Sequence, residues 1–214
     1  GPGSGPVVLS EALMPFAPLP AVVRDGDGTL RLVDEENAAE DSPESFGRMS
    51  AFHGQMGMFT RALAYILSHG ADGLRQVSGD AVLNANYVLR ELEDVLEAPF
   101  AHSGPCMHEA LFADGGFAKG VSTLDVAKTL IDEGFHPMTM YFPLVVHGAM
   151  LIEPTESESK ATLDEFIGAL RSIAERAREG DPTLGQAPFF APRRRVDEAL
   201  AARKPRLAWS EAEG

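Results

Sequence analysis

Two segments that carry both a helix start signal and a helix stop signal constrain the fold of this chain most. The Ser-x-x-Asp pattern at 122–125 precedes apolar residues spaced three and four apart, and Gly134 follows them. A Thr-x-x-Glu pattern at 155–158 precedes a second run of this kind, which Gly180 follows. A capping box begins a helix, and a glycine in the left-handed conformation ends one. Both segments are therefore predicted to be helices.

Two more periodic stretches and several short apolar runs surround these helices. The periodic stretches predict a helix from Arg48 to Gly70 and another over 74–95, in whose apolar stripe Asn84 needs a hydrogen-bond partner. The short runs predict strands over 97–102, 107–112, 138–142 and 149–152. This order of helices and strands is typical of an α/β layer with a mostly antiparallel sheet.

The two ends of the chain differ in composition from this central part. Residues 1–23 hold five prolines between short apolar runs and are predicted to be extended and partly strand, while the Asp-Gly pairs at 25–29 predict a hairpin turn. The acidic segment 35–44 is predicted to be an exposed loop. The predicted parts are an extended segment at 1–47, a small α/β domain at 48–180, and an irregular and helical tail at 181–214.

The composition argues against several classes of function. Apolar residues make up 44% and charged residues 23% of the 214, as in ordinary globular proteins. A formal net charge of -14 repels nucleic-acid phosphates and anionic lipid surfaces, and no apolar run approaches the roughly 18 residues of a membrane span. Cys106, the only cysteine, allows no intramolecular disulfide and no cysteine metal cluster. We therefore expect a cytoplasmic protein that binds neither nucleic acid nor membranes.

Six stretches in a consistent order carry a family resemblance. They are GPGSGPV at 1–7, AVLNANYVLRELE at 81–93, HEALF at 108–112, GVSTLDVAKTLIDEGFHPMTMYFPLVV at 120–146, LIEPTESESKATLDEFIGAL at 151–170, and RRVDEALAARKP at 194–205. Together they resemble the carboxy-terminal part of the glycine dehydrogenase (decarboxylating) P-protein of the glycine cleavage system, in its second subunit.

The resemblance implies a fold, an activity and a set of partners. The fold would be the small carboxy-terminal domain of the aspartate-aminotransferase-type (fold type I) pyridoxal-phosphate enzymes, joined through 1–47 to the end of the large domain. The parent enzyme would decarboxylate glycine on pyridoxal phosphate and pass the aminomethyl group to the lipoyl arm of the H-protein. Other implied partners are the amino-terminal remainder of the P-protein or its other subunit, within an oligomer.

The cofactor's anchoring lysine is expected outside this chain. In the family that lysine lies shortly before a glycine-rich run, and this chain has no lysine before Lys119. The isolated chain is therefore expected to be inactive, with no catalytic residue of its own and no covalently bound cofactor. The resemblance implies that Gly1, Gly3 and Ser4 reach the cofactor phosphate, since glycines let backbone N–H groups approach an anion closely. The sequence GPGS at residues 1–4 also occurs as the remnant of a cleaved purification tag. Whether it is such a remnant or part of a native glycine-rich loop stays open.

Three residues are predicted to lie along the substrate channel. His108 and Glu109 fall in a predicted strand, where neighbouring side chains point to opposite faces, so only one of them can face a site. A hydrogen-bonded structural role is the alternative for His108. His136 is held extended by Pro137 and, with Thr139, either lines the channel or forms an ordinary turn. No histidine pair has the spacing of metal ligands, so no metal site is predicted.

Two carboxylates are predicted to be structural. Glu153 stands in a strand and is expected to form a buried ion pair or hydrogen bond. Glu156 precedes a helix, whose dipole stabilises an acid by roughly 0.3 to 1 kcal/mol. The cluster of Met49, Met56 and Met58 is predicted to pack in the core.

Alternatives from the same and from other classes remain open. One is another fold type I enzyme, such as a relative of cysteine desulfurase or glycine hydroxymethyltransferase, and another is a stand-alone binding or assembly module. Phe189 stands where the family commonly has a histidine, which puts any role of that histidine in doubt. Whether the parent is one chain or two subunits, and whether this chain is a fragment, also stays open.

Overall fold

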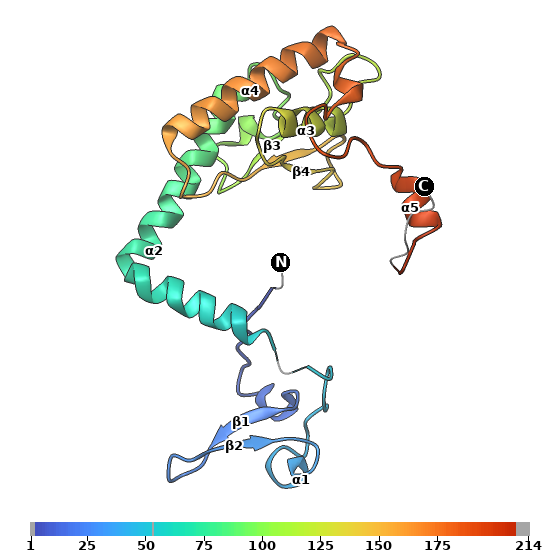
Figure 1. The fold of residues 1–214 in the computed structure, drawn as a ribbon. Helices are drawn as coiled ribbons and strands as arrows, with labels where there is room; N and C mark the ends of the chain where they lie inside the picture. Colours follow the sequence, from blue (N-terminus) through green and yellow to red (C-terminus); the bar gives the residue numbers. More distant parts are fainter. Residues whose placement is uncertain (1–2, 53, 209–214) are drawn as a thin grey trace. The chain divides into compact units, whose positions relative to one another are not determined.

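The computed structural model describes residues 3–52 and 54–208 and divides into two compact units (Figure 1). The first unit covers Gly1–Ala71 and the second Asp72–Gly214. The division therefore lies later in the chain than the boundary predicted after residue 47. The helix predicted to open the small α/β domain belongs to the first unit instead.

A β-hairpin forms the centre of the first unit. Strand β1 (Ala21–Arg24) pairs antiparallel with β2 (Leu30–Val33), and the Asp25 N–H donates to the Thr29 carbonyl at 2.9 Å across the turn. The hairpin predicted from the Asp-Gly pairs is confirmed. A short 3-10 helix, η1 (Met14–Phe16), precedes it.

Arginine side chains tie the acidic segment to this hairpin. The Arg31 guanidinium donates to Asp25 at 3.0 Å and to both carboxylate oxygens of Asp41 at 2.5 and 2.6 Å. Arg48 binds Glu35 in the same forked manner at 2.6 and 2.7 Å. The segment predicted to be a loop also contains a single helical turn, α1 (Ala38–Asp41).

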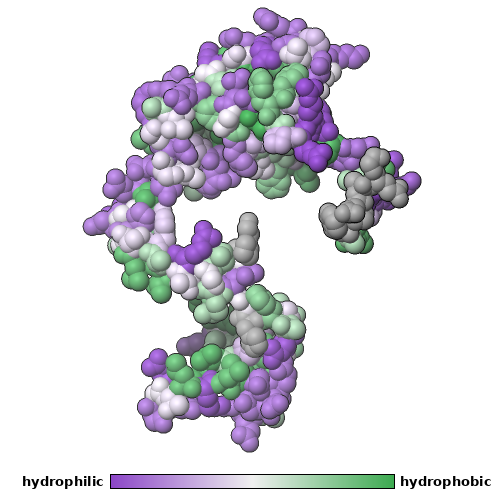
Figure 2. Space-filling model, viewed as in Figure 1, coloured by the Kyte–Doolittle hydropathy of each residue, from purple (hydrophilic) through white to green (hydrophobic). Residues whose placement is uncertain are grey.

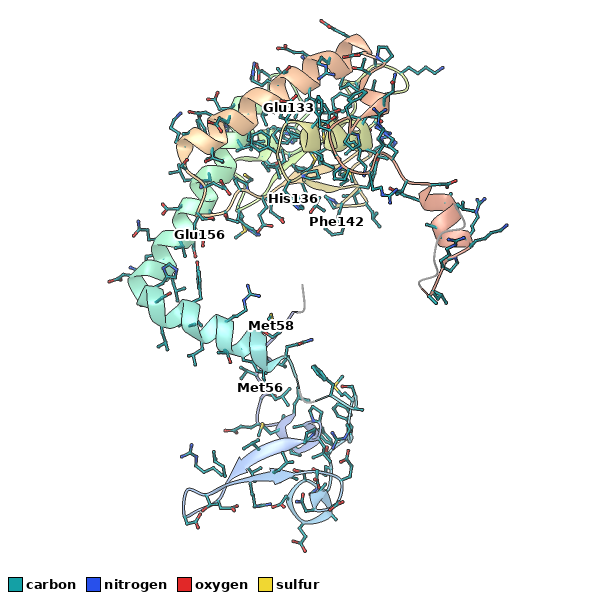
Figure 3. All side chains as sticks on the ribbon, in the orientation of Figure 1. Met56, Met58, Glu133, His136, Phe142 and Glu156 are labelled. Carbon is teal, nitrogen blue, oxygen red and sulfur yellow. The ribbon has the colours of Figure 1, made fainter. Side chains whose placement is uncertain are left out.

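Helix α2 (Met56–Leu92) begins later than predicted and is broken at Gly70, whose φ of 61° and ψ of -173° are not helical. The predicted end at Gly70 is confirmed, but the predicted start at Arg48 is wrong. The methionines predicted to be core are also not buried: Met49 is 76% and Met56 64% exposed. Met56 and Met58 lie on the first turn of α2 (Figure 3), and the space-filling view shows apolar surface on this unit (Figure 2). The described part of the unit lacks a second layer to cover this helix.

The second unit is an α/β layer around one core. Its sheet has the order β3 (Ala110–Phe112), β5 (Met150–Ile152), β4 (Thr139–Met140), and both pairings are antiparallel. Helices α3 (Thr123–Asp132) and α4 (Lys160–Glu179) pack with the sheet and with the end of α2. The largest fully buried side chains include Leu92, Phe112, Leu130, Met150 and Leu170. The predicted antiparallel α/β layer is confirmed.

Polar contacts join α4 to the second part of α2. The Arg171 guanidinium donates to the Glu91 carbonyl at 2.6 Å and to both oxygens of Asp94 at 2.7 Å. The Tyr87 hydroxyl donates to Asp164 at 2.6 Å. Asn84, which was predicted to need a partner, donates to the Thr155 carbonyl at 2.9 Å. These bonds hold residues far apart in the sequence in one layer.

The helix ends follow the capping signals with one exception. Ser122 and the N3 carboxylate of α3 form the predicted capping box, and Gly180 ends α4 in the left-handed conformation. Helix α4, however, is capped by Ser159 and not by Thr155. The Thr155 hydroxyl is hydrogen-bonded to the Ser157 hydroxyl at 2.8 Å instead, so the chain turns before the helix begins.

The strand predicted over 97–102 is wrong. Only Glu97 forms an isolated bridge, with Ala113, and a 3-10 helix η2 (Ala101–Ser103) follows. Pro99 cannot donate a ladder hydrogen bond, which disfavours a longer strand here. The strand predicted to begin at residue 107 begins at Ala110.

The tail folds back onto helix α3. The Phe189 and Phe190 N–H groups donate to Asp132 at 2.6 and 2.9 Å, and Arg195 pairs with Asp125. The tail also contains η3 (Leu184–Gln186) and α5 (Glu198–Arg203). Among the described residues, no helix combines the length and the hydrophobicity needed to cross a lipid bilayer.

Candidate functional site

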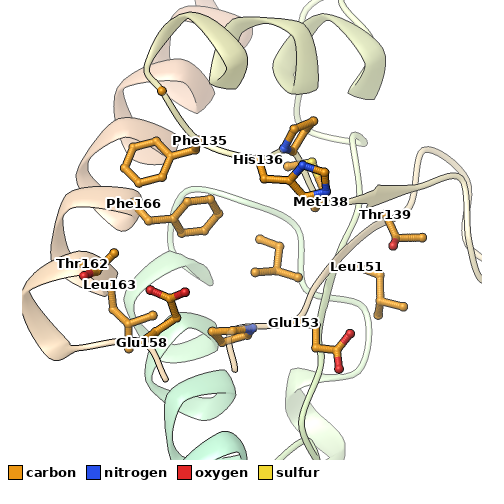
Figure 4. A pocket seen from close by; sticks show the side chains of 14 residues that line it. Phe135, His136, Met138, Thr139, Leu151, Glu153, Glu158, Thr162, Leu163 and Phe166 are labelled. Carbon is orange, nitrogen blue, oxygen red and sulfur yellow. The ribbon is translucent and has the colours of Figure 1, made fainter. Parts of the chain in front are cut away.

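A pocket of about 440 Å³ opens between the corner 134–138, the strands β4 and β5, and the start of α4 (Figure 4). The corner exists because Gly134, with a φ of 86°, ends helix α3 and Pro137 keeps the following chain extended. The residues of β4 pair with β5, which brings the corner beside the end of β5. The pocket therefore belongs wholly to the second unit.

One wall of the pocket is aromatic and aliphatic. The rings of Phe135 and Phe166 pack edge to face, with centroids 5.4 Å apart and planes at 77°. Leu163 lies beside Phe166, whereas Leu151 lines the pocket on the side of Thr139 and Glu153 (Figure 4). Such a wall excludes water from one side of a small bound molecule and leaves recognition to the polar side chains opposite.

Polar side chains from four segments line the rest. His136 comes from the corner, Thr139 from β4, Glu153 from the end of β5, and Glu158 and Thr162 from around the start of α4. His136 and Thr139 are both exposed. The structure thus brings together His136, Thr139 and Glu153, which were predicted separately. One imidazole and two carboxylates can bind a small molecule that carries an ammonium group or hydroxyl groups.

His108 lies beside this pocket and not in it. Its Nε2 atom is 3.8 Å from Glu153 Oε1, and the side chains of His108, Glu109 and Glu153 converge, with their ligand atoms within 4.8 Å of one another. The prediction that His108 and Glu109 point to opposite faces is wrong because both precede β3, where the alternation of an extended strand does not hold.

The predicted burial of Glu153 is also wrong. Its side chain is 56% exposed, because it follows the last residue of β5 and so lies beyond the sheet. The adjacent Pro154 is buried in its place. Glu156 is half-buried in the turn ahead of α4, so its structural role stays a prediction.

The predicted phosphate contacts lie in the first unit. Gly3 and Ser4 are exposed, and nothing lies within 4 Å of where a side chain at Gly3 would begin. Ser4 borders a shallow hollow that is also lined by Arg61 and Tyr65. Gly1 falls outside the described residues.

These residues do not by themselves fit pyridoxal phosphate. No lysine or arginine lines the 440 Å³ pocket. Lys160, close to it in sequence, donates instead to Asp164 at 2.7 Å and to the Tyr87 hydroxyl at 3.1 Å. The Asp164 hydrogen bond, followed by that to Tyr87, raises the pKa of Lys160, which opposes the loss of a proton that imine formation requires. This pocket therefore offers neither a lysine for a covalent anchor nor a cationic side chain for the cofactor phosphate.

Several site residues were missed at the sequence level. Phe135 and Phe166 were not singled out from the sequence, although Phe135 sits directly beside His136. Glu109 was set aside because of the wrong strand boundary. The antiparallel pairing of the two neighbouring strands is the signal that could have placed it beside Glu153.

The chain is similar to known proteins over almost all of its length. A family model described as "Glycine dehydrogenase, C-terminal domain" matches residues 77–184, which include every residue that lines the pocket. The chain is 64% identical over 211 residues to the probable glycine dehydrogenase (decarboxylating) subunit 2 of Caulobacter vibrioides, covering 98% of this chain and 40% of that protein. It is 49% identical over 210 residues to the same subunit of Shouchella clausii, covering 98% and 41%.

A solved structure has a similar fold. The crystal structure of a glycine decarboxylase (P-protein) of the glycine cleavage system, in inhibitor-bound form, matches 76% of this chain and 37% of its own, with a TM-score of 0.56 and 20% sequence identity. The chain spans about two fifths of the length of the curated relatives it matches. With the family model matching half of its length, the chain belongs to the family of glycine dehydrogenase carboxy-terminal domains.

Proposed function

We propose that this chain is the carboxy-terminal part of a glycine dehydrogenase (decarboxylating) subunit 2. The parent enzyme would decarboxylate glycine and transfer the remaining aminomethyl group to the lipoyl arm of the H-protein. One observation carries the proposal: the matched segment 77–184 contains every residue that lines the pocket, in a chain similar over 98% of its length to such a subunit.

The pocket has the size and chemistry for a contribution to glycine binding. Its polar side can accept hydrogen bonds from an ammonium group at Glu153 or Glu158 and can donate one from His136. The pair of Phe135 and Phe166 excludes water from the opposite side. The chain would thus orient and enclose the substrate while the reacting groups come from elsewhere.

Pyridoxal phosphate would be held by the remainder of the parent. The cofactor supplies the electron sink that accepts the electrons of the departing carboxylate. No lysine of this chain lines the pocket, and the anchoring residue would accordingly belong to that remainder. The chain alone would accordingly be inactive.

The partners and the compartment follow from the same proposal. The amino-terminal remainder of the P-protein or its other subunit would complete the cleft, and the lipoyl-bearing H-protein would enter it. The single free cysteine, Cys106, favours a reducing cytoplasm. A stand-alone assembly module is the second candidate, favoured only by the exposed apolar residues of the first unit, such as Met56 and Leu63.

The test is His136→Ala in the complete enzyme, with His69→Ala as the control. His69 is exposed on α2, outside the pocket, and its ring contacts that of Tyr65 with centroids 4.3 Å apart and planes at 55°. Exchange of carbon dioxide with the glycine carboxylate is measured in the presence of the lipoyl carrier protein, with melting temperature on the same samples. We expect exchange to fall at least about tenfold for His136→Ala at unchanged melting temperature, and not for His69→Ala. Wild-type exchange in His136→Ala would show that the residue is structural.

A further inference from the structure

Two carboxylates face each other at the end of the paired strands β3 and β5. The last pair of this ladder is Ala110 with Ile152, so the next position sets Glu109 opposite Glu153. Like charges directly opposite in an antiparallel pair are destabilising. An uncompensated pair at this place would weaken the sheet edge.

The compensating group in the chain itself is an imidazole. His108 Nε2 lies 3.8 Å from Glu153 Oε1, and one ligand atom from each of the three side chains lies within 4.8 Å of the others. Across the described ranges 3–52 and 54–208, no lysine or arginine forms an ion pair with Glu109 or Glu153. A neutral imidazole leaves the two negative charges in place.

We propose that His108, Glu109 and Glu153 bind a divalent transition-metal ion, with zinc as the ion that fits the donors best. One imidazole nitrogen and two carboxylate oxygens form a donor set of the type that holds zinc, with an open position for water. Zinc binds these atoms at about 2.0 to 2.2 Å, which places neighbouring ligand atoms roughly 3.4 Å apart. His108 Nε2 and Glu153 Oε1 are 3.8 Å apart and the other ligand atoms lie within 4.8 Å, so binding requires rotation of the side chains toward the ion.

The position of the three residues favours a defined site over loose surface binding. Glu109 and Glu153 directly flank the last residue pair of the ladder, and His108 is adjacent to Glu109 in sequence. Glu109 is half-buried, whereas His108 and Glu153 are open to solvent. The ion would therefore contact the protein on the side of Glu109 and water on the side of His108 and Glu153. Glu153 also lines the pocket, so the ion would lie at the pocket's rim.

Zinc titration of the 214-residue chain by calorimetry in about 0.15 M salt tests the site, since salt screens loose attraction to the acidic surface. We expect saturation at one equivalent. Loss of any one ligand should raise the dissociation constant for zinc about tenfold or more, in the variants His108→Gln, Glu109→Gln and Glu153→Gln. The matched controls are His136→Gln and Glu158→Gln, which change the same residue types in the adjacent pocket but outside the cluster.

A second readout on the wild-type chain does not depend on how the variants fold. In a nitrogen-detected spectrum of the histidine side chains, one equivalent of zinc should shift the ring nitrogens of His108 and leave those of His136 unchanged. Absence of saturable binding, an unmoved His108 resonance, or equal weakening by Glu158→Gln would each overturn the proposal. These measurements require neither glycine nor the rest of the enzyme. The proposed metal site can therefore be refuted without refuting the proposed function, and the reverse also holds.

Discussion

Arg195 Nη2 lies 2.7 Å from Asp125 Oδ1, and this ion pair fastens the tail to the first turn of helix α3. The Asp125 side chain is 8% exposed, and its other oxygen accepts from the Ser122 N–H and hydroxyl at 2.8 Å each. Arg195 also donates to the Ala187 carbonyl at 2.8 Å and the Leu184 carbonyl at 3.1 Å. One carboxylate thus caps a helix and receives the tail.

Asp125→Asn should lower the free energy of unfolding by about 1 to 3 kcal/mol. The substitution removes the charge from the capping box and takes away the carboxylate partner of the Arg195 guanidinium. Arg193→Ala is the control, because Arg193 is an exposed tail residue and should change stability by no more than about 0.5 kcal/mol. Urea denaturation followed by circular dichroism measures both. Equal midpoints for the two variants would contradict the central role of Asp125.

The same carboxylate predicts a dependence of stability on pH. Burial raises the pKa of Asp125, but hydrogen bonds from the Ser122 side chain and backbone and from Arg195 outweigh it and hold the pKa below its ordinary value. A depressed folded pKa stabilises the protein fully above the unfolded pKa of about 3.9, and this stabilisation is lost as the pH falls through the folded pKa. The stability gap between wild type and Asp125→Asn should therefore be constant above about pH 5 and shrink below about pH 4. A gap that stays constant down to pH 3 would argue against this linkage.

Gly148→Ala should destabilise the second unit by more than about 1 kcal/mol. Gly148 has a φ of 57°, is buried, and a Cβ there would overlap the carboxylate of Asp114. Its carbonyl also accepts from the buried Thr123 hydroxyl at 2.6 Å, so the backbone cannot move freely. Gly168→Ala is the control, because it is an exposed position of α4 with nothing within 4 Å, and alanine should stabilise it by about 0.5 to 1 kcal/mol. A fall in melting temperature for both variants would contradict the expected difference between Gly148 and Gly168.

Glu153→Gln and Glu158→Gln should have the same small effect on stability. Both side chains are exposed, so each substitution should change the free energy of unfolding by no more than about 0.5 kcal/mol in the absence of metal. This replaces the unequal effect that a buried Glu153 would cause. Chemical denaturation in the presence of a chelator is the measurement. A much lower denaturation midpoint for Glu153→Gln would support the prediction that the Glu153 carboxylate is buried.

The isolated chain should form no stoichiometric adduct with pyridoxal phosphate. Lys160 is engaged by Asp164 and Tyr87, and none of the four lysines lines the pocket. Incubation with the cofactor, borohydride reduction and peptide mapping provide the measurement. A single modified residue at Lys119 or Lys128 would mean that the chain carries an anchor of its own.

Sequence patterns predicted the second unit well where local signals decide the structure. Helix α3 begins at its capping box, α4 ends at Gly180, and β4 and β5 fall inside the predicted runs. These features depend on residues within one or two turns of each other. The residues that determine these features are therefore neighbours in the sequence, and the pattern can be recognised without knowing the rest of the fold.

Features that depend on distant residues were predicted less well. The segment before α4 is one such feature, because the Thr155 carbonyl accepts from the distant Asn84 side chain at 2.9 Å and Ser159 caps the helix. Glu153 was assigned to the buried sheet because the apolar run alone does not mark the last paired residue. The methionines of α2 have helical spacing, but spacing cannot reveal whether another element covers that face.

The two tail contacts on helix α3 together couple the length of this helix to the length of the tail. Asp125 and Asp132 lie about two helical turns apart, and they bind Arg195 and the Phe189 and Phe190 amides respectively. An inserted or deleted residue between the two aspartates would rotate one of them by about 100° and release its half of the tail. Lengthening of α3 during evolution would therefore have to be matched by a change in the tail between Phe190 and Arg195. The two segments can be expected to vary in length only as a pair.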